Sequence, residues 1–177
     1  MHPLLKQLEG GDRRSLGNVG QVVEDVRNDP SLFEILIDGL FMDSPLIRMR
    51  TADAVEKITT DHCEYLQPFK QRLILLSGRT TQQEIKWHLA QILPRLKLKS
   101  NEKKAVVKNL FDFLNDRSKI VVTFALQALA DFAEEDEKLR PRVIRIVEEL
   151  IETGSPAIKN RSRKLLEKLN KSEPLND

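Results

Sequence analysis

Cysteine, aromatic residues and long apolar runs are all scarce in this 177-residue chain. The one cysteine, Cys63, excludes an internal disulfide and favours a reducing compartment, so we expect a cytoplasmic location. No apolar run approaches the roughly 18 residues of a membrane span. The first residues also lack the apolar core of a signal peptide. We therefore expect neither a disulfide-stapled secreted domain nor a membrane protein.

The motifs of common enzyme classes are missing as well. The sequence has no Walker phosphate-binding loop, no Gly-x-Gly-x-x-Gly fingerprint and no His-Glu-x-x-His zinc motif. One cluster of reactive side-chain types occurs, at residues 61–64, but its adjacent His62 and Cys63 would point apart. The cluster also lacks the two spaced ligand pairs that zinc prefers. We expect a protein that is not an enzyme and has no metal and no cofactor, with a polar turn at these residues.

What the chain does contain is one segment in four copies. Ile47–Ile58, Ile85–Leu96, Val121–Phe132 and Ile158–Leu169 share one apolar frame, and their first residues are 38, 36 and 37 apart. Apolar or small residues recur at positions zero, four, seven, eight and eleven, which places them on one stripe of a helix. The predicted buried stripe consists of Ile47, Thr51, Ala54, Val55, Ile58, Ile85, Leu89, Ile92, Leu93, Leu96, Val121, Ala125, Ala128, Leu129, Phe132, Ile158, Ser162, Leu165, Leu166 and Leu169.

A second amphipathic run precedes each copy, and a short polar turn joins the two. These runs are Leu32–Met42, Pro68–Leu76, Ala105–Leu114 and Val143–Ile151. Self-similarity at a period of roughly 20–50 residues is typical of a solenoid. We predict a single solenoid domain over 1–177, with helix-turn-helix repeats at 31–66, 67–100, 101–136 and 137–170. A divergent repeat or cap at 1–30, with a helix from Arg13 to Arg27 that buries Leu16, would precede them, and a disordered tail at 171–177 would follow.

The repeated unit resembles the HEAT repeat of the armadillo-like superhelical family over about Ser31 to Asn170. The family motif is a turn Asp, often Pro, then Val/Ile-Arg-x-x-Ala-x-x-Ala-Leu, and the first copy matches it through Asp43, Pro45, Ile47, Arg48, Ala54 and Val55. The third copy departs from the motif, with Val122 in place of the basic residue. The resemblance implies an all-α, right-handed α-α superhelix of about four to five helical hairpins. It also implies that the second helices line a concave face.

A surface for a protein partner is predicted on the side of each second helix that faces away from the stripe. Trp87, the single tryptophan, stands there at position two of the second copy, and Trp and Arg are enriched at interface hot spots. The competing interpretation packs Trp87 on the neighbouring repeat. We predict a non-catalytic scaffold or adaptor that binds another protein or peptide on its concave face. The predicted contact residues are Met49, Arg50, Asp53, Trp87, His88, Gln91, Gln127, Arg161 and Lys164.

Basic residues gather in the second part of the chain and support an alternative, nucleic-acid binding. Residues 1–66 carry 7 Lys and Arg against 12 Asp and Glu, whereas residues 67–177 carry 22 against 15. The net charge of only +2 argues against an obligate nucleic-acid binder, and charge runs are more often solvated helix surface. A HEAT-like DNA glycosylase fits less well, because the residue four positions after Trp87 is Gln91 and not a carboxylate. The possible nucleic-acid contacts are Arg95, Lys97, Lys99, Lys103, Lys104 and Lys108.

Overall fold

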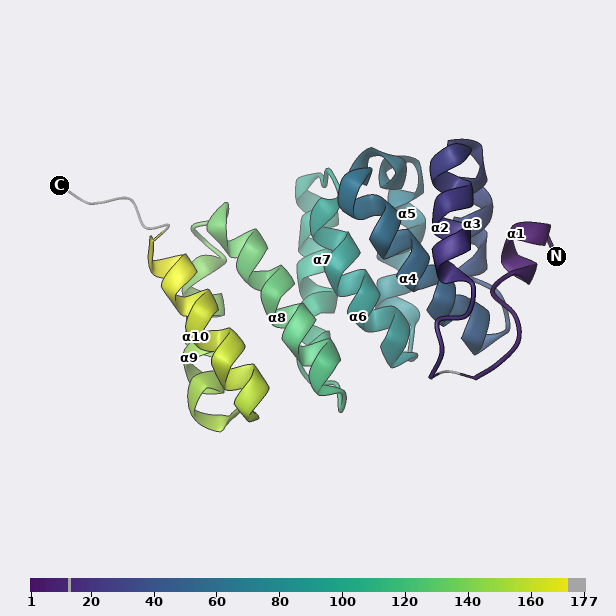
Figure 1. Ribbon diagram of the computed structural model, residues 1–177. Coiled ribbons are helices and arrows are strands. Elements are labelled where there is room, and N and C mark those ends of the chain that lie inside the picture. Colours follow the sequence, from purple (N-terminus) through teal and green to yellow (C-terminus); the bar gives the residue numbers. More distant parts are fainter. Residues whose placement is uncertain (13, 172–177) are drawn as a thin grey trace. The chain divides into compact units, whose positions relative to one another are not determined.

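The chain folds into helices joined by short turns (Figure 1). The structure is a computed structural model that describes residues 1–12 and 14–171. Three 3-10 segments, at Pro30–Leu32, Cys63–Phe69 and Leu93–Arg95, lie between α-helices. The α-helices of the described residues are α1 (Pro3–Lys6), α2 (Val19–Asn28), α3 (Phe33–Gly39), α4 (Pro45–Asp61), α5 (Lys70–Arg79), α6 (Gln83–Ile92), α7 (Ser100–Phe113), α8 (Lys119–Glu134), α9 (Arg140–Thr153) and α10 (Pro156–Lys171).

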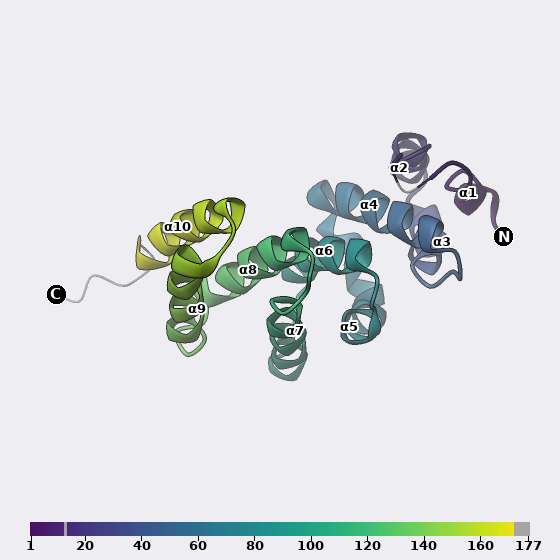
Figure 2. The same cartoon turned by 90° about the horizontal axis from the view of Figure 1, so that it is seen from below.

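The helices form two compact units, Met1–Lys97 and Leu98–Asp177. In the first unit α4 is central, because it packs against α2, α3 and α6. Figure 2 shows α2, α4 and α6 in one layer of this unit, with α3 and α5 in the other. In the second unit α8 packs against α7, α9 and α10, and α9 packs against α10. Each unit is thus built from helical hairpins, while the prediction of one solenoid domain stays a prediction.

The predicted stripe forms the core of both units. Eighteen of its twenty residues are buried, and the two others, Phe132 and Leu166, are half-buried. Thr51 and Ser162 carry hydroxyl groups and are nevertheless fully buried. Their small side chains let the neighbouring helix approach closely. The all-α repeat architecture expected from the sequence is confirmed, since the period of burial along each second helix is that of the apolar frame.

Local chemistry explains where the second helices begin and end. Ser44 and Ser118 cap α4 and α8, and each hydroxyl accepts the backbone N–H three residues later. Pro94, which has no N–H to donate, follows the last residues of α6 and turns the chain into a 3-10 segment. Gly39 lets α3 and α4 touch, because an added Cβ would lie 2.4 Å from the hydroxyl of Thr51.

The structure differs from the prediction at the N-terminal end of the chain. The helix expected from Arg13 is wrong: α2 begins at Val19, and Leu16 is 48% exposed. Gly17 adopts a positive φ of 54° and its N–H binds the hydroxyl of Ser15, so residues 14–18 form a turn instead of a helix. At the other end α10 extends to Lys171, and the rest of the predicted tail, 172–177, lies outside the described residues.

Candidate interaction site

The second helices contact one another through two recurring positions, three and six of each copy. In the second unit the Nη1 of Arg161 on α10 donates to the Oε1 of Gln127 on α8 at 2.8 Å. In the first unit the equivalent atoms are the Nε2 of His88 on α6 and the Oδ1 of Asp53 on α4, 4.0 Å apart. Position six of one helix therefore meets position three of the next helix in both units. Four predicted surface residues form contacts inside the units, which corrects the view of them as a free row.

Arg50, at position three of the first copy, has no preceding second helix of this kind to meet. Its guanidinium is buried, 1% exposed, and donates to backbone carbonyls of the N-terminal segment. The accepting carbonyls are those of Leu8, Glu9, Gly10, Asp12 and Ser15, at 2.7 to 3.2 Å. The prediction of Arg50 as a partner contact is wrong, because its buried side chain fastens residues 8–12 and Ser15 to α4.

Burial also leaves three other predicted contacts with little open surface. Met49 is 5% exposed, His88 is 8% exposed and Asp53 is 9% exposed. The physical reason is that α4 lies between α2 and α6 while α3 covers a third side, so more than one stripe of the helix is enclosed. Met49 is a core side chain. Asp53 and His88 sit at the border of the core, and the Oδ2 of Asp53 pairs with the ammonium of Lys57.

Trp87 and Gln91 keep part of their surface open. Both are half-buried on α6, and the Gln91 side chain donates to the Trp87 carbonyl at 3.2 Å. The indole ring lies 5.8 Å from the His88 ring at an interplanar angle of 56°. Lys164, on α10 of the second unit, is exposed. Of the predicted contacts in the first unit, Trp87 and Gln91 thus keep the most surface open to a partner.

Ionisable groups surround His88. Burial lowers the pKa of His88, and the negative charges of Asp53, Glu56 and Glu84 oppose that shift. The Nδ1 of His88 and the Oε2 of Glu84 are buried and have no hydrogen-bond partner. Buried polar atoms are nearly always paired in folded proteins, so two orphans on adjacent turns of one helix need an explanation. We name Asp53, Glu56, Glu84, Trp87 and His88 the α4–α6 site.

Glu84 and Glu56 are not among the contacts predicted from the sequence, although the sequence contains a signal for Glu84. Glu84 precedes Trp87 by three residues and His88 by four, the spacings at which side chains share one face of a helix. Glu84 is 9% exposed although it lies in the first turn of α6, where a carboxylate is ordinarily solvated. A carboxylate, an indole and an imidazole therefore occur together on one face of α6.

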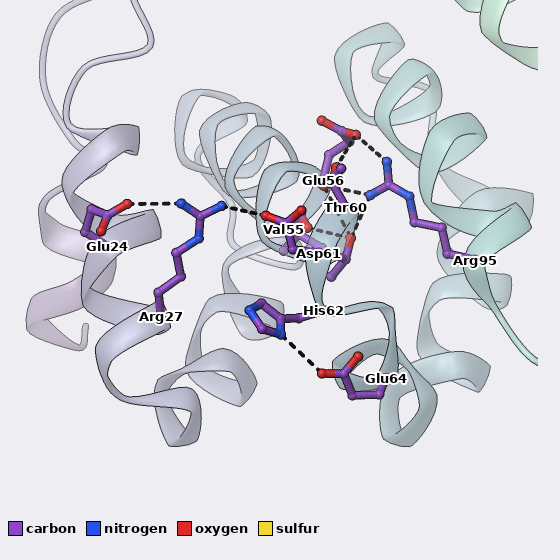
Figure 3. Close-up of polar contacts among 10 residues, drawn as sticks. Glu24, Arg27, Val55, Glu56, Thr60, Asp61, His62, Glu64 and Arg95 are labelled. Atoms are coloured by element: carbon purple, nitrogen blue, oxygen red, sulfur yellow. Dashed lines mark hydrogen bonds and ion pairs between the residues drawn. The ribbon is translucent and has the colours of Figure 1, made fainter.

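Two arginines, one on α2 and one in the 3-10 segment after α6, tie these elements to the last turns of α4 (Figure 3). Arg27 on α2 bridges Glu24 and Asp61, with N–O distances of 3.1 and 3.0 Å. Arg95 binds the carboxylate and the carbonyl of Glu56, and also the hydroxyl of Thr59. Arg95 is thus bound to α4, and its role as a nucleic-acid contact stays a prediction.

The turn after α4 contains the reactive side-chain types noted in the sequence. His62 Nδ1 lies 3.3 Å from Glu64 Oε1, and the His62 ring stacks on Tyr65 at 5.0 Å. Cys63 is exposed and makes no disulfide. These contacts are those of a polar inter-repeat turn.

The remaining basic residues divide between the two units. Lys103 pairs with Asp136 at 3.0 Å and Lys108 with Asp112 at 2.9 Å, so both charges are partly neutralised. Lys97, in the first unit, and Lys99 and Lys104, in the second, are exposed. A continuous basic surface through all six predicted contacts stays a prediction. Two of the six, Lys103 and Lys108, form ion pairs within the second unit.

Residues 1–12 and 14–171 contain neither a metal-binding cluster nor a membrane-spanning helix. No three His, Cys, Asp or Glu side chains are grouped there in a way that could hold a metal ion. No helix in that part of the chain combines the length and the apolar character needed to cross a membrane.

Comparison with known proteins gives the fold. No protein-family model and no curated protein matches the chain. An engineered protein from a structural genomics consortium aligns with a TM-score of 0.65 at 18% identity, over 95% of this chain and 80% of its own. A designed armadillo repeat protein in complex with the peptide (KR)4 aligns with a TM-score of 0.63 at 15% identity, over 95% and 81%. Computationally designed armadillo repeat proteins for modular peptide recognition give 0.61 at 14% identity, over 93% and 80%. Identity this low shows the fold alone, so this chain has the helical-repeat fold of the armadillo and HEAT type.

Proposed function

We propose that the chain is a non-catalytic scaffold that binds an extended, basic segment of a partner protein at the α4–α6 site. The observation that carries this proposal is the orphaned Oε2 of Glu84, buried on the same face of α6 as the half-open Trp87. An unpaired buried carboxylate oxygen costs free energy unless a donor reaches it. A cationic side chain of a partner would supply that donor.

The chemistry of the neighbouring groups fits a lysine or arginine. Asp53 is paired with Lys57 and Glu56 with Arg95, which leaves Glu84 as the carboxylate of the site without a cation. A guanidinium or ammonium on an indole face gains about 0.5 to 2 kcal/mol. A charged donor on a buried carboxylate gains about 1.5 to 3 kcal/mol. Trp87 and Glu84 together therefore favour a basic partner over an acidic one.

The structural neighbours are compatible with this chemistry. One neighbour is described in complex with the peptide (KR)4 and another as designed for modular peptide recognition. Those statements concern the designed proteins. For this chain they support a helical-repeat surface that receives an extended segment, with the α4–α6 site as the anchor.

The test titrates the full chain with a peptide of alternating lysine and arginine and measures heat release. We expect binding, and we expect Trp87→Ala to weaken it by about tenfold, the loss that corresponds to about 1.4 kcal/mol. Phe41→Ala is the matched control, because Phe41 is an exposed aromatic of the same unit, 44% exposed, outside the α4–α6 site. Equal effects of the two variants, or no binding by the parent, would contradict the proposal.

Nucleic-acid binding remains the competing outcome of that test. An oligonucleotide that binds the parent more tightly than the peptide does, with affinity that falls steeply with salt, would favour it. In that case Lys104→Glu should reduce binding and Trp87→Ala should leave it unchanged. The α4–α6 site predicts the opposite pattern.

A further inference from the structure

The second unit contains an open pocket that the proposed function does not use. It lies between the beginning of α7 and the turn from α8 to α9, and its volume is about 420 Å³. Volumes of roughly 300 to 1,000 Å³ are typical of ligand-binding clefts. The lining residues are Ser100, Lys103, Lys104, Val107, Asp136, Lys138 and Leu139, which we name the α7 pocket.

The walls of the α7 pocket are held in place by hydrogen bonds. Asp136 accepts the backbone N–H groups of Lys138 and Leu139, both at 3.1 Å, and pairs with Lys103 of α7 at 3.0 Å. The hydrogen bond from Lys103 lowers the pKa of Asp136, so this carboxylate stays ionised well into acid. Behind the turn the buried Arg140 donates to the carbonyls of Ala133 and Glu134. A pocket fixed in this way loses little freedom when a ligand binds.

The charge of the α7 pocket is unbalanced. It contains three lysines and one carboxylate, and Lys103 already occupies that carboxylate. Lys104 and Lys138 are both exposed, and neither forms an ion pair within the described part of the chain. In the same lining, Val107 and Leu139 offer half-buried apolar surface. The arrangement has two available cations and an apolar wall.

We propose that the α7 pocket binds an acidic segment of a protein, one that carries carboxylates next to an aliphatic side chain. The aliphatic group packs against Val107 and Leu139, while the carboxylates bind Lys104 and Lys138. Charge-assisted hydrogen bonds of this kind are roughly twice as strong as neutral ones. This site lies in the second unit and is independent of the α4–α6 site, which takes a basic ligand.

A phosphate chain fits the α7 pocket less well than an acidic protein segment. Glu135 and Glu137, in the same turn as Lys138, are both exposed and would repel the successive phosphates of a long chain that extends past the pocket, whereas a short acidic segment can keep its carboxylates within the pocket. Tracking of nucleic acid also relies on aromatic stacking or on a long basic groove, and the lining contains no aromatic residue. A peptide needs charge complementarity at the pocket alone.

The experiment uses the full chain and a short labelled peptide of alternating glutamate and leucine, with fluorescence anisotropy as the readout. We expect saturable binding, and at least tenfold weaker binding for the same peptide with glutamine in place of glutamate. Lys104→Glu should also weaken binding at least tenfold. Lys119→Glu is the matched control, because this exposed lysine begins α8 at the other end of the helix from the turn, about 24 Å away for 16 residues.

Several results would overturn the proposal. Equal losses for Lys104→Glu and Lys119→Glu would mean that net charge, not the pocket, attracts the peptide. An oligonucleotide that competes for Lys104 and binds more tightly than the peptide would replace the protein ligand by a phosphate ligand. Absence of binding by the parent would eliminate the site. The Trp87→Ala variant should still bind the glutamate–leucine peptide, whether or not the α4–α6 site binds a basic segment.

Discussion

Two copies of one inter-helix contact differ in chemistry between the units. In the second unit Gln127 and Arg161 are joined by a hydrogen bond of 2.8 Å, and Gln127 also binds Asp131. In the first unit the equivalent Asp53 and His88 are 4.0 Å apart, and an imidazole nitrogen and a nearby carboxylate oxygen lack partners. In the second unit this contact is closed by a hydrogen bond, whereas in the first unit two polar atoms beside the contact have no partner. We propose that this position of the repeat serves as a clasp in the second unit and as part of the ligand site in the first.

The largest effect is expected at Arg50, the position-three residue of the first copy. Arg50→Met keeps the aliphatic stem but removes the donors to five backbone carbonyls of the N-terminal segment. Several buried acceptors would lose their partners, so we expect a loss of about 3 kcal/mol or more in the free energy of unfolding. Chemical denaturation measures it. The control is Arg79→Met, an exposed arginine at the end of α5; a similar loss there would contradict the role of Arg50.

The helical stripe could be predicted from the sequence, and the contacts of Arg50 could not. Burial follows the helical period, so Ile47, Ala54 and Ile58 identify the inner face of α4 by their spacing alone. The partners of Arg50 are backbone carbonyls of an irregular segment, which leave no side-chain pattern. Met49 and Asp53 were misplaced for a different reason: a helix with neighbours on three sides buries more than one stripe.

A second prediction compares Trp87 with the core. Because Trp87 is half-buried, Trp87→Ala should cost about 1 to 2 kcal/mol of stability, less than the 3 to 5 kcal/mol typical of a core aromatic. Thermal or chemical unfolding of the variant decides between these two ranges of stability loss. A cost in the core range would show that the indole is a packing residue and would remove it from the α4–α6 site.

Loss of the Gln127–Arg161 clasp in the second unit should lower the stability of the protein and leave peptide binding unchanged. Gln127→Ala removes the hydrogen bonds to Arg161 and Asp131, so we expect a loss of about 1 kcal/mol. Peptide affinity at the α4–α6 site should stay at the parental value in calorimetry. A variant with full stability and reduced peptide affinity would reverse the assignment of the two units.

A smaller effect is expected from pH. The folded-state pKa of His88 lies below its ordinary 6.5, so its contribution to stability is complete above 6.5 and is lost as the pH falls through the folded value. The denaturation midpoint of the parent should therefore decrease on acidification from neutral pH. The same series on His88→Gln should be flatter between pH 7 and 5, where Asp136, with its lowered pKa, does not titrate. Parallel curves would show that His88 is not the group responsible.

The unpaired carboxylate of Glu84 gives the most direct test of the account. Glu84→Gln keeps the shape of the side chain but removes the buried charge, so the free protein should be as stable as the parent or slightly more stable. The affinity for the lysine–arginine peptide should nevertheless fall by about tenfold, because the acceptor for the cation is gone. Calorimetric titration and chemical denaturation of parent and variant, measured side by side, decide the question. Preserved stability with weakened binding is the predicted result, and unchanged affinity would contradict the assignment of the α4–α6 site.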